Sequence, residues 1–392
     1  MKNNIAYKNV NRNNKNINKR SSYFYFKKSS LWKYIFIISL SILVLKILIK
    51  NKVLFLSSKK LLKGDKNYRS SDIHNNSNIY NIKKENKFFF FEKNQDELNY
   101  CNNYGILIYD YFDGKEEYVE GNIGDYIQSL AALQYLPKNC KPYFIDRDAV
   151  RYYYGPKVKL IMNSWNHIIR PNTYISNHIS PLFVSYHIDN DNKLPSMYVQ
   201  NLKKYSPIGC RDNKTRDQLN NYGIKAFFSS CLTTTLDIDY AEDQSQRTNE
   251  IIFVDYELGK NTKEEKFFIS LKSYNFSNIT HMHHEYILES KTHIERFKLA
   301  KSLLVRYSKA KLVVSTRIHA ALPCLALNTP VIFVNKKYDK RYPGLYELLN
   351  TIGINKENKF DIRVNIDNNG LVYNSKDYLK YANKLKDLLK NF

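Results

Sequence analysis

The sequence contains few of the residues that mark several specialised folds. Among 392 residues it has only 12 glycines and 10 prolines, which excludes collagen-like chains and Pro/Gly-rich low-complexity chains. Five scattered cysteines exclude a small disulfide-stapled domain, and none of them has the Cys-x-x-Cys spacing of a metal site. They are Cys101, Cys140, Cys210, Cys231 and Cys324. No repeat of fixed period is present either. These absences favour an ordinary globular protein.

The chain has 61 Lys and Arg residues against 37 Asp and Glu residues, a formal net charge of +24. Such an excess can indicate a nucleic-acid partner. However, Asn and Lys are abundant throughout, and no RNP, zinc-finger or helix-turn-helix signature accompanies the charge, so we expect no nucleic-acid binding. Hydrophobic residues make up 43% of the sequence and aromatic residues 14%. This composition predicts a buried core, in one large or two ordinary domains.

The first hundred residues differ in composition from the rest. Residues 1–30 are rich in Asn and Lys and contain no Asp or Glu, which predicts a disordered basic tail. Residues 31–50 form an apolar run close to the ~20 residues that span a bilayer as a helix. Trp32 and Tyr34 suit one membrane interface, and Lys46 can extend toward the other. Residues 51–100 are polar and predict a stem. We interpret residues 31–50 as an uncleaved transmembrane signal anchor.

Alternatives to the anchor are a buried soluble helix and a cleaved signal peptide. The 30-residue lead and the missing small-x-small site argue against cleavage. Basic residues flank the run equally on both sides, so the positive-inside rule does not orient it. A short tail before a single anchor is commonly cytosolic, so we expect a single-pass type II membrane protein, of Golgi type if the source is eukaryotic.

From Tyr104 onward, strand and helix patterns alternate. Short apolar runs predict strands, and segments with helical spacing, 126–136 and 213–222, follow or separate them, the second closing at Gly223. The predicted strands are 105–109, 143–145, 158–162, 182–186 and 226–228. This alternation predicts an α/β domain with a largely parallel sheet over residues 101–240.

A polar segment at 240–249 predicts an interdomain linker, and a second α/β pattern follows it over residues 249–392. Its predicted strands are 251–254, 312–315 and 331–334, and its predicted helices are 294–307, 318–327 and a terminal amphipathic helix from Tyr378. We therefore predict two Rossmann-like domains, with a ligand cleft between the carboxyl ends of their strands.

The strongest local motif is Ser315-Thr-Arg-Ile-His-Ala320, which follows a strand and opens a helix. Backbone N–H groups at a helix start favour an anion, and the planar donors of Arg317 suit phosphate or carboxylate. His319 adds a group that exchanges protons near neutral pH. The structural alternative is an arginine that pairs with a carboxylate and a histidine packed in the helix face.

Two further loops carry polar residues at element ends. Ser206–Thr215 places Arg211 at the end of an apolar strand; its structural alternative is a surface pair between Arg211 and Asp212. Gly121-Asn-Ile-Gly-Asp125 allows tight backbone turning and places Asp125 at a helix start. The cluster His281-Met-His-His-Glu285 lacks any standard zinc spacing, so we expect no metal site.

Six stretches, in matching order and spacing, resemble the polysaccharide pyruvyl transferase family from about Tyr104 to Asn350. They begin at Gly121, Phe144, Pro181, Pro207, Phe228 and Ala310. Ala320 and Asn328 depart from the residues that this family usually places there, but neither change removes a charged group.

The resemblance implies a two-domain fold like that of GT-B glycosyltransferases. It implies transfer of the pyruvyl group of phosphoenolpyruvate to glycan hydroxyls as a pyruvate ketal, without a cofactor. Arg317, His319 and Arg211 then correspond to residues associated with the donor's anionic groups. Two arginines can bind both acidic groups of the donor, so the reaction does not require a metal ion. The acid–base steps require side chains that transfer protons. His319 is the first candidate for these, and His187, after an apolar strand, is the second.

The acceptor side of the cleft is expected to involve Asn122, Asp125 and Arg147. A GT-B-type glycosyltransferase using a nucleotide sugar is the alternative function. Such an enzyme would need a carboxylate to bind the ribose of the nucleotide, and the sequence after Pro330 has no clear glutamate at the matching position. A catalytically inactive glycan-binding protein is the third alternative; it would lack the basic clamp, whose residues are all present.

Overall fold

The computed structural model describes residues 98–110, 120–166, 174–188, 193–237, 247–288 and 291–392. The predicted tail (1–30), anchor (31–50), most of the stem (51–100) and most of the linker (240–249) lie outside these residues. All described residues belong to one compact unit. No helix in the described ranges combines the length and the apolar character needed to cross a membrane. Below, the amino-terminal half means residues 98–237 and the carboxyl-terminal half means residues 247–392.

The amino-terminal half contains a four-stranded parallel sheet in the order β3-β1-β4-β6. These strands are β1 (Tyr100–Ile108), β3 (Lys141–Asp146), β4 (Val158–Met162) and β6 (Ile179–Phe183). Helices α2 (Ile123–Leu133), α3 (Ser196–Lys203) and α4 (Asn213–Asn221) accompany the sheet, with 3₁₀ helices at Arg147–Tyr152 and η5 (Leu232–Thr235). Two small parallel pairs follow: β5 (Trp165–Asn166) with β7 (His187–Ile188), and β8 (Ile208–Cys210) with β9 (Ala226–Phe228).

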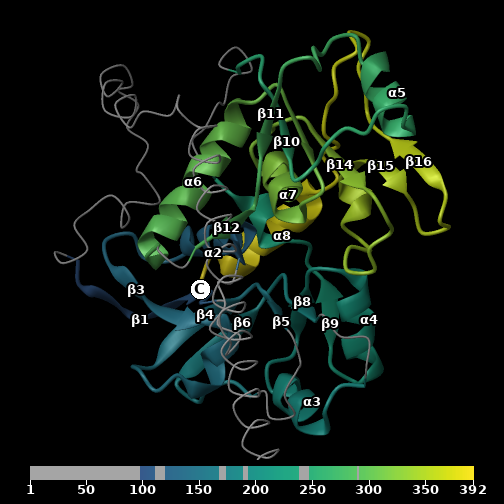
Figure 1. Ribbon diagram of the computed structural model, residues 1–392. Coiled ribbons are helices and arrows are strands. Elements are labelled where there is room, and N and C mark those ends of the chain that lie inside the picture. Colours follow the sequence, from purple (N-terminus) through teal and green to yellow (C-terminus); the bar gives the residue numbers. More distant parts are fainter. Residues whose placement is uncertain (1–97, 111–119, 167–173, 189–192, 238–246, 289–290) are drawn as a thin grey trace, which may run out of the picture. The chain divides into compact units, whose positions relative to one another are not determined.

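The carboxyl-terminal half contains a six-stranded sheet in the order β11-β10-β13-β14-β15-β16, parallel except for the last pair. Its strands are β10 (Ile251–Val254), β11 (Ile279–Met282), β13 (Leu312–Ser315), β14 (Val331–Asn335), β15 (Asn350–Ile354) and β16 (Phe360–Arg363). Its helices are α5 (Lys263–Ser270), α6 (His293–Lys309), α7 (Ile318–Ala326) and α8 (Leu379–Leu389), with a 3₁₀ turn at Tyr346–Leu348. The mixed α/β class with parallel sheets is therefore confirmed (Figure 1).

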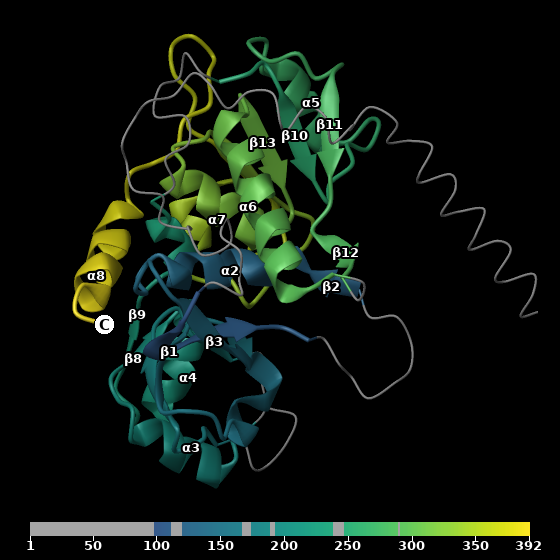
Figure 2. The same ribbon diagram turned by 90° about the vertical axis from the view of Figure 1, so that its left-hand side faces the viewer.

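The central strands of the six-stranded sheet are apolar because both of their faces are buried. Along β10, Ile252 and Val254 join the core that also contains α6 and α7, whereas Ile251 and Phe253 join a second core with Phe268 of α5. This alternation follows from the two-residue repeat of a strand. Figure 2 shows α6 and α7 on one side of these strands and α5 on the other.

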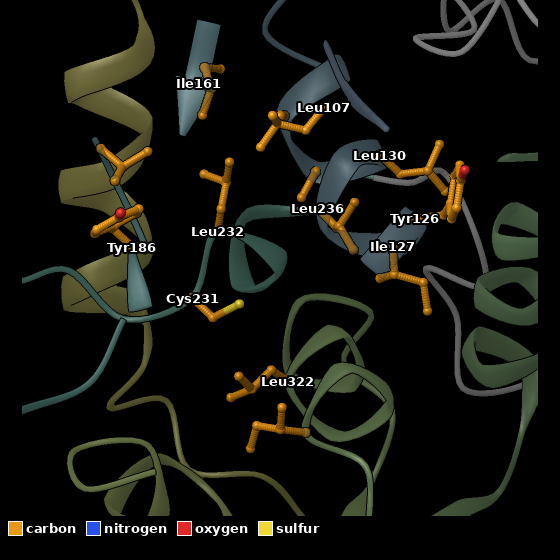
Figure 3. Packing of buried hydrophobic residues seen from close by; sticks show 14 of the residues in the cluster. Leu107, Tyr126, Ile127, Leu130, Ile161, Tyr186, Cys231, Leu232, Leu236 and Leu322 are labelled. Carbon is orange, nitrogen blue, oxygen red and sulfur yellow. The ribbon is translucent and has the colours of Figure 1, made fainter. Parts of the chain in front are cut away.

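The larger core is continuous between the two halves. Helix α2 of the amino-terminal half packs against α6 and α7, and η5 packs against α7 and α8. Figure 3 shows Cys231 between Leu232 and Leu322 of α7, with the α2 residues Ile127 and Leu130 to the right. The halves are also joined by backbone hydrogen bonds, because β2 (Glu120–Asn122) pairs antiparallel with β12 (Glu285–Ile287) (Figure 2).

One covalent link was not predicted from the sequence. Cys101 of β1 and Cys140, just before β3, form a disulfide with their Cα atoms 4.8 Å apart. It joins neighbouring strands of the four-stranded sheet. Cys210, Cys231 and Cys324 are free and buried, as expected for small apolar residues.

Candidate active site

A cavity of about 270 Å³ lies where several loops of the two halves meet. Six of the seven site residues predicted from the sequence line it: Asn122, Asp125, His187, Arg211, Arg317 and His319. Trp165, His284, Ile318, Arg341 and Tyr342 complete the lining. Arg147 is the predicted residue that does not line it.

The start of α2 forms one side of the cavity. Asn122 caps this helix, and its side chain accepts a hydrogen bond from the Gly124 N–H at 2.9 Å. A Cβ atom at Gly124 would lie 3.0 Å from the His319 Cβ and 3.1 Å from the His284 Nδ1. The close approach of two histidines therefore favours a residue without a Cβ atom at this position. The same cap starts the helix at Ile123, three residues before the predicted position.

Arg147 supports the cavity from behind. Its guanidinium forms a two-pronged pair with Asp148, at 2.9 and 2.8 Å, and lies over the rings of Tyr109 and Trp165. The Arg147 Nη1 is 3.9 Å from the Asp125 Oδ2. Its place is consistent with shaping the wall that carries Asp125 and Trp165, rather than with direct contact to a ligand.

Arg211 is buried, and no counter-charge pairs with it in the described part of the chain. It follows β8, is 3% exposed, and its Nε has no hydrogen-bond partner in the described ranges. No ion pair of its guanidinium occurs there either, so the structural alternative, a surface pair with Asp212, is absent from these ranges. Burying an unpaired cation costs several kcal/mol, which an anion in the cavity would offset.

Asp212 instead pairs with His187. The His187 Nδ1 lies 2.5 Å from the Asp212 Oδ2, and both side chains are at most 1% exposed. Asp212 also caps α4, because its Oδ1 accepts the Thr215 N–H at 2.8 Å, and its Oδ2 accepts the Thr215 hydroxyl at 3.1 Å. The carboxylate is thus fixed at a helix start, and it orients the imidazole at the cavity wall.

Arg317 is held by two carboxylates. Its Nε donates to the Asp255 Oδ2 at 2.6 Å, and its Nη2 donates to the Glu285 Oε1 at 2.5 Å. Burial alone would raise the pKa of Asp255, but the charge of Arg317 and hydrogen bonds from His283, His284 and Arg317 lower it. The structural alternative considered for Arg317, a carboxylate partner, is therefore present in a residue that also lines the cavity.

His319, on the first turn of α7, is 6% exposed, and its buried Nε2 has no hydrogen-bond partner in the described part of the chain. Burial lowers the pKa of His319 well below 6.5, and the nearby Arg211 lowers it further, as do His284, His187 and Arg341. The imidazole is neutral at pH 7 unless an anion enters.

Five residues that line the cavity were not predicted from the sequence: Trp165, His284, Ile318, Arg341 and Tyr342. Arg341 and Tyr342 follow β14, whose carboxyl end lies beside that of β13, so the strand order was the signal that could have found them. Arg341 pairs with Asp339, with its Nη2 2.6 Å from the Asp339 Oδ2. His284 stood in the His281–Glu285 cluster, which was considered only for metal binding. No group of three or more His, Cys, Asp or Glu residues in the described ranges is placed to hold a metal ion.

A second cavity, of about 260 Å³, lies at β14–β16. Its lining includes Tyr338, Tyr346 and Gly353 but none of the residues predicted from the sequence. The chemistry of paired arginines and histidines is concentrated in the first cavity.

Comparison with known proteins places the chain in a family. The family model of the polysaccharide pyruvyl transferases matches residues 122–338, more than half of the chain. Among solved structures, an uncharacterized protein from Klebsiella pneumoniae subsp. pneumoniae NTUH-K2044 aligns at 14% identity, covering 63% of this chain and 88% of that chain, with a TM-score of 0.36. No curated protein matches the sequence. The matched segment contains Asn122, His187, Arg211, Arg317 and His319. The chain belongs to the polysaccharide pyruvyl transferase family and is a transferase.

Proposed function

We propose that this transferase moves the pyruvyl group of phosphoenolpyruvate onto a pair of glycan hydroxyls, forming a pyruvate ketal in the Arg211–Arg317 cavity. The observation that carries the proposal is the buried guanidinium of Arg211, which lacks a counter-charge in the described ranges and shares the cavity with His319 and Arg317. A bound anionic ligand would stabilise such a buried cation.

The size and charge of the cavity fit this donor. Phosphoenolpyruvate carries a phosphate and a carboxylate close together, and Arg211, Arg317 and Arg341 all line the cavity. Its volume of about 270 Å³ lies just below the ~300–1,000 Å³ typical of sites for drug-sized ligands. A small metabolite fits this space better than a whole nucleotide sugar, which disfavours the alternative glycosyltransferase.

The proposed reaction needs one proton donor and one proton acceptor. A sugar hydroxyl adds to C2 of the donor while C3 gains a proton, the C2–O–phosphate bond breaks, and a second hydroxyl closes the ketal. Of the two hydroxyl protons, one is balanced by the new C–H bond and the other leaves with inorganic phosphate. His187, oriented by Asp212, is suited to take the sugar proton.

His319 is suited to the donor side. Burial lowers its pKa, which leaves the imidazole neutral at pH 7. A bound phosphate dianion would raise that pKa and let the imidazole carry a proton toward the leaving group or C3. Asn122 and Asp125 then face the acceptor sugar, with Arg147 behind Asp125.

We further propose a GT-B-like two-domain arrangement and a type II anchor at residues 31–50. Two separate, largely parallel sheets, with α8 packing against η5 of the amino-terminal half, support the first. The Cys101–Cys140 disulfide supports the second, because disulfides persist in oxidising compartments such as the secretory lumen. With the amino-terminal tail in the cytosol, a single anchor would place the catalytic part on the lumenal side of the membrane.

The test is direct. The full-length chain is incubated with phosphoenolpyruvate and a panel of galactosides and hexosamines, and released phosphate and the mass of the sugar are measured. We expect phosphate release in step with addition of one pyruvyl group. The Arg211→Gln variant should lose this activity, whereas Arg363→Gln, which changes a half-exposed arginine at β16, should keep it. Sugar transfer from UDP- or GDP-sugars without use of phosphoenolpyruvate would reverse the assignment.

A further inference from the structure

His284 is fixed at the junction of the two halves. It precedes β12, is fully buried, and lines the cavity. Its carbonyl accepts the N–H of Ile123, the first residue of α2, at 2.8 Å. Its own N–H donates to the Asp255 Oδ2 at 3.1 Å. The backbone therefore holds this imidazole between the start of α2 and the carboxylate that binds Arg317.

Tyr307 fixes the tautomer of His284. The Tyr307 hydroxyl, on α6, lies 2.8 Å from the His284 Nε2, and both side chains are fully buried. Burial raises the pKa of Tyr307 well above 10, so the hydroxyl keeps its proton. Nε2 is its hydrogen-bond partner in the described part of the chain, and a buried O–H needs an acceptor. Tyr307 therefore donates to Nε2, and the ring proton of the neutral imidazole resides on Nδ1.

The Nδ1–H group is left without a partner in the described ranges. It lies 3.1 Å from the position that a Cβ atom would take at Gly124, beside His319. Burial lowers the pKa of His284 to about 4, and Arg317 also lowers it while Asp255 raises it. At pH 7 the ring is thus an uncharged donor, and its Nδ1–H has no hydrogen-bond acceptor in the described ranges.

We propose that His284 binds the donor substrate by donating its Nδ1–H to an oxyanion oxygen, with Tyr307 as the positioning residue that sets the tautomer. This inference rests on the proposed function of the same cavity. A neutral imidazole adds a directed hydrogen bond without further charge beside Arg317, and it can polarise an oxygen without losing its own proton. The ligand class is a carboxylate or a phosphate group, which share this chemistry.

Binding of phosphoenolpyruvate to full-length variants tests the inference by calorimetry. His284→Ala should weaken affinity at least about 10-fold, the effect of losing one hydrogen bond to a charged group. His284→Asn, which can place an N–H near the Nδ1 position, should recover part of that loss. Tyr307→Phe should weaken affinity less than His284→Ala does. The control His178→Asn changes a partly buried histidine bonded to the Gly155 carbonyl, away from the cavity, and should leave affinity unchanged.

Nuclear magnetic resonance of ¹⁵N-histidine-labelled protein gives a readout that packing alone would not move, and it serves if His284→Ala fails to fold. We expect the Nδ1–H tautomer for His284 in the wild-type protein, a mixture of tautomers in Tyr307→Phe, and a shift of the Nδ1 resonance with phosphoenolpyruvate. Inorganic phosphate and pyruvate, added separately, identify which oxyanion contacts the ring.

An Nε2–H tautomer in the wild-type protein, or an unshifted Nδ1 in saturated protein, would overturn the role of His284. Unchanged affinity in His284→Ala would do the same. If the wild-type chain consumes phosphoenolpyruvate in these cases, the proposed function survives without this contact. If the wild-type chain binds none of the three anions, both fail together.

Discussion

The two walls of the cavity hold their arginines in opposite ways. On the Arg211 wall, formed by Arg211, His187 and Asp212, the only carboxylate is engaged by the histidine, and Arg211 has no counter-charge in the described ranges. On the Arg317 wall, formed by His284, Arg317 and His319, the arginine is held by Asp255 and Glu285, while the histidines lack carboxylate partners there. One wall thus keeps an uncompensated cation for a ligand, and the other keeps an aligned cation whose charge is already balanced.

Arg211→Gln should have the largest effect on binding. We expect phosphoenolpyruvate affinity to fall at least about 30-fold, because losing one partner of a buried charge pair costs about 2–5 kcal/mol. The thermal stability of the empty protein should stay level or rise, because an unpaired buried charge is removed. Calorimetry and thermal denaturation measure the two effects, and a strongly destabilised variant would show that Arg211 has a counter-charge after all.

Lowering the pH should destabilise the folded protein through the two histidines of the Arg317 wall. The pKa of His284 is lowered from 6.5 to about 4 in the folded state, and that of His319 is lowered as well. The free energy of unfolding should therefore be highest above pH 6.5 and fall as the pH is lowered toward 4, because the unfolded chain binds protons that the folded chain excludes. For His284 the loss amounts to about 3 kcal/mol. Urea unfolding at pH 7, 5.5 and 4.5 measures this loss. The free energy of unfolding should depend less steeply on pH in His284→Asn than in the wild-type protein. An equal dependence in the two proteins would contradict the prediction.

Arg317→Gln should reduce affinity about 10-fold, less than Arg211→Gln, because its charge is already shared with two carboxylates. In contrast to Arg211→Gln, it should lower the free energy of unfolding by about 1 kcal/mol, since Asp255 and Glu285 lose their partner. Side-by-side titration and denaturation of the two variants test the comparison. It breaks down if Arg317→Gln is the more stable of the two.

Glu285→Gln should leave Arg317 with less charge compensation and so make it more similar to Arg211. Removing the half-exposed carboxylate frees one donor of Arg317, so we expect affinity for phosphoenolpyruvate to rise about 3-fold at low salt, and less at high salt. Asp361→Asn, next to Arg363 at β16, is the matched control. A fall in affinity would indicate that Glu285 itself contributes to the site.

Elements with a strong local pattern could be predicted from the sequence. The strands at 251–254 and 312–315 match the predictions because they are short apolar runs buried on both faces, and the strand at 158–162 matches although its Lys159 is exposed. The start of α2 was misplaced, because the Asn122 cap outweighs the apolar spacing that begins at Tyr126. The disulfide between Cys101 and Cys140 was missed because a separation of 39 residues says nothing about which strands are neighbours.

The same distinction applies to the site. Arg211, Arg317 and His319 were recognised because each follows a strand and lies in a family motif. His284 acquires its place only through Tyr307, on another element, and through the space left by Gly124. The pairing of His187 with Asp212 likewise depends on β7 and α4 meeting in three dimensions. Partner choice among buried polar groups is a tertiary property that residue spacing does not encode.

The ladder between β2 and β12 has a mechanical consequence. It exchanges backbone hydrogen bonds between the two halves directly beside Asn122 and His284, and the Ile123 N–H to His284 carbonyl bond extends it. Pulling the halves apart along this seam would break several of these bonds at once. The part of the cavity formed by Asn122 and His284 is therefore held together by backbone hydrogen bonds, and it should move less than the parts that are joined by side chains alone.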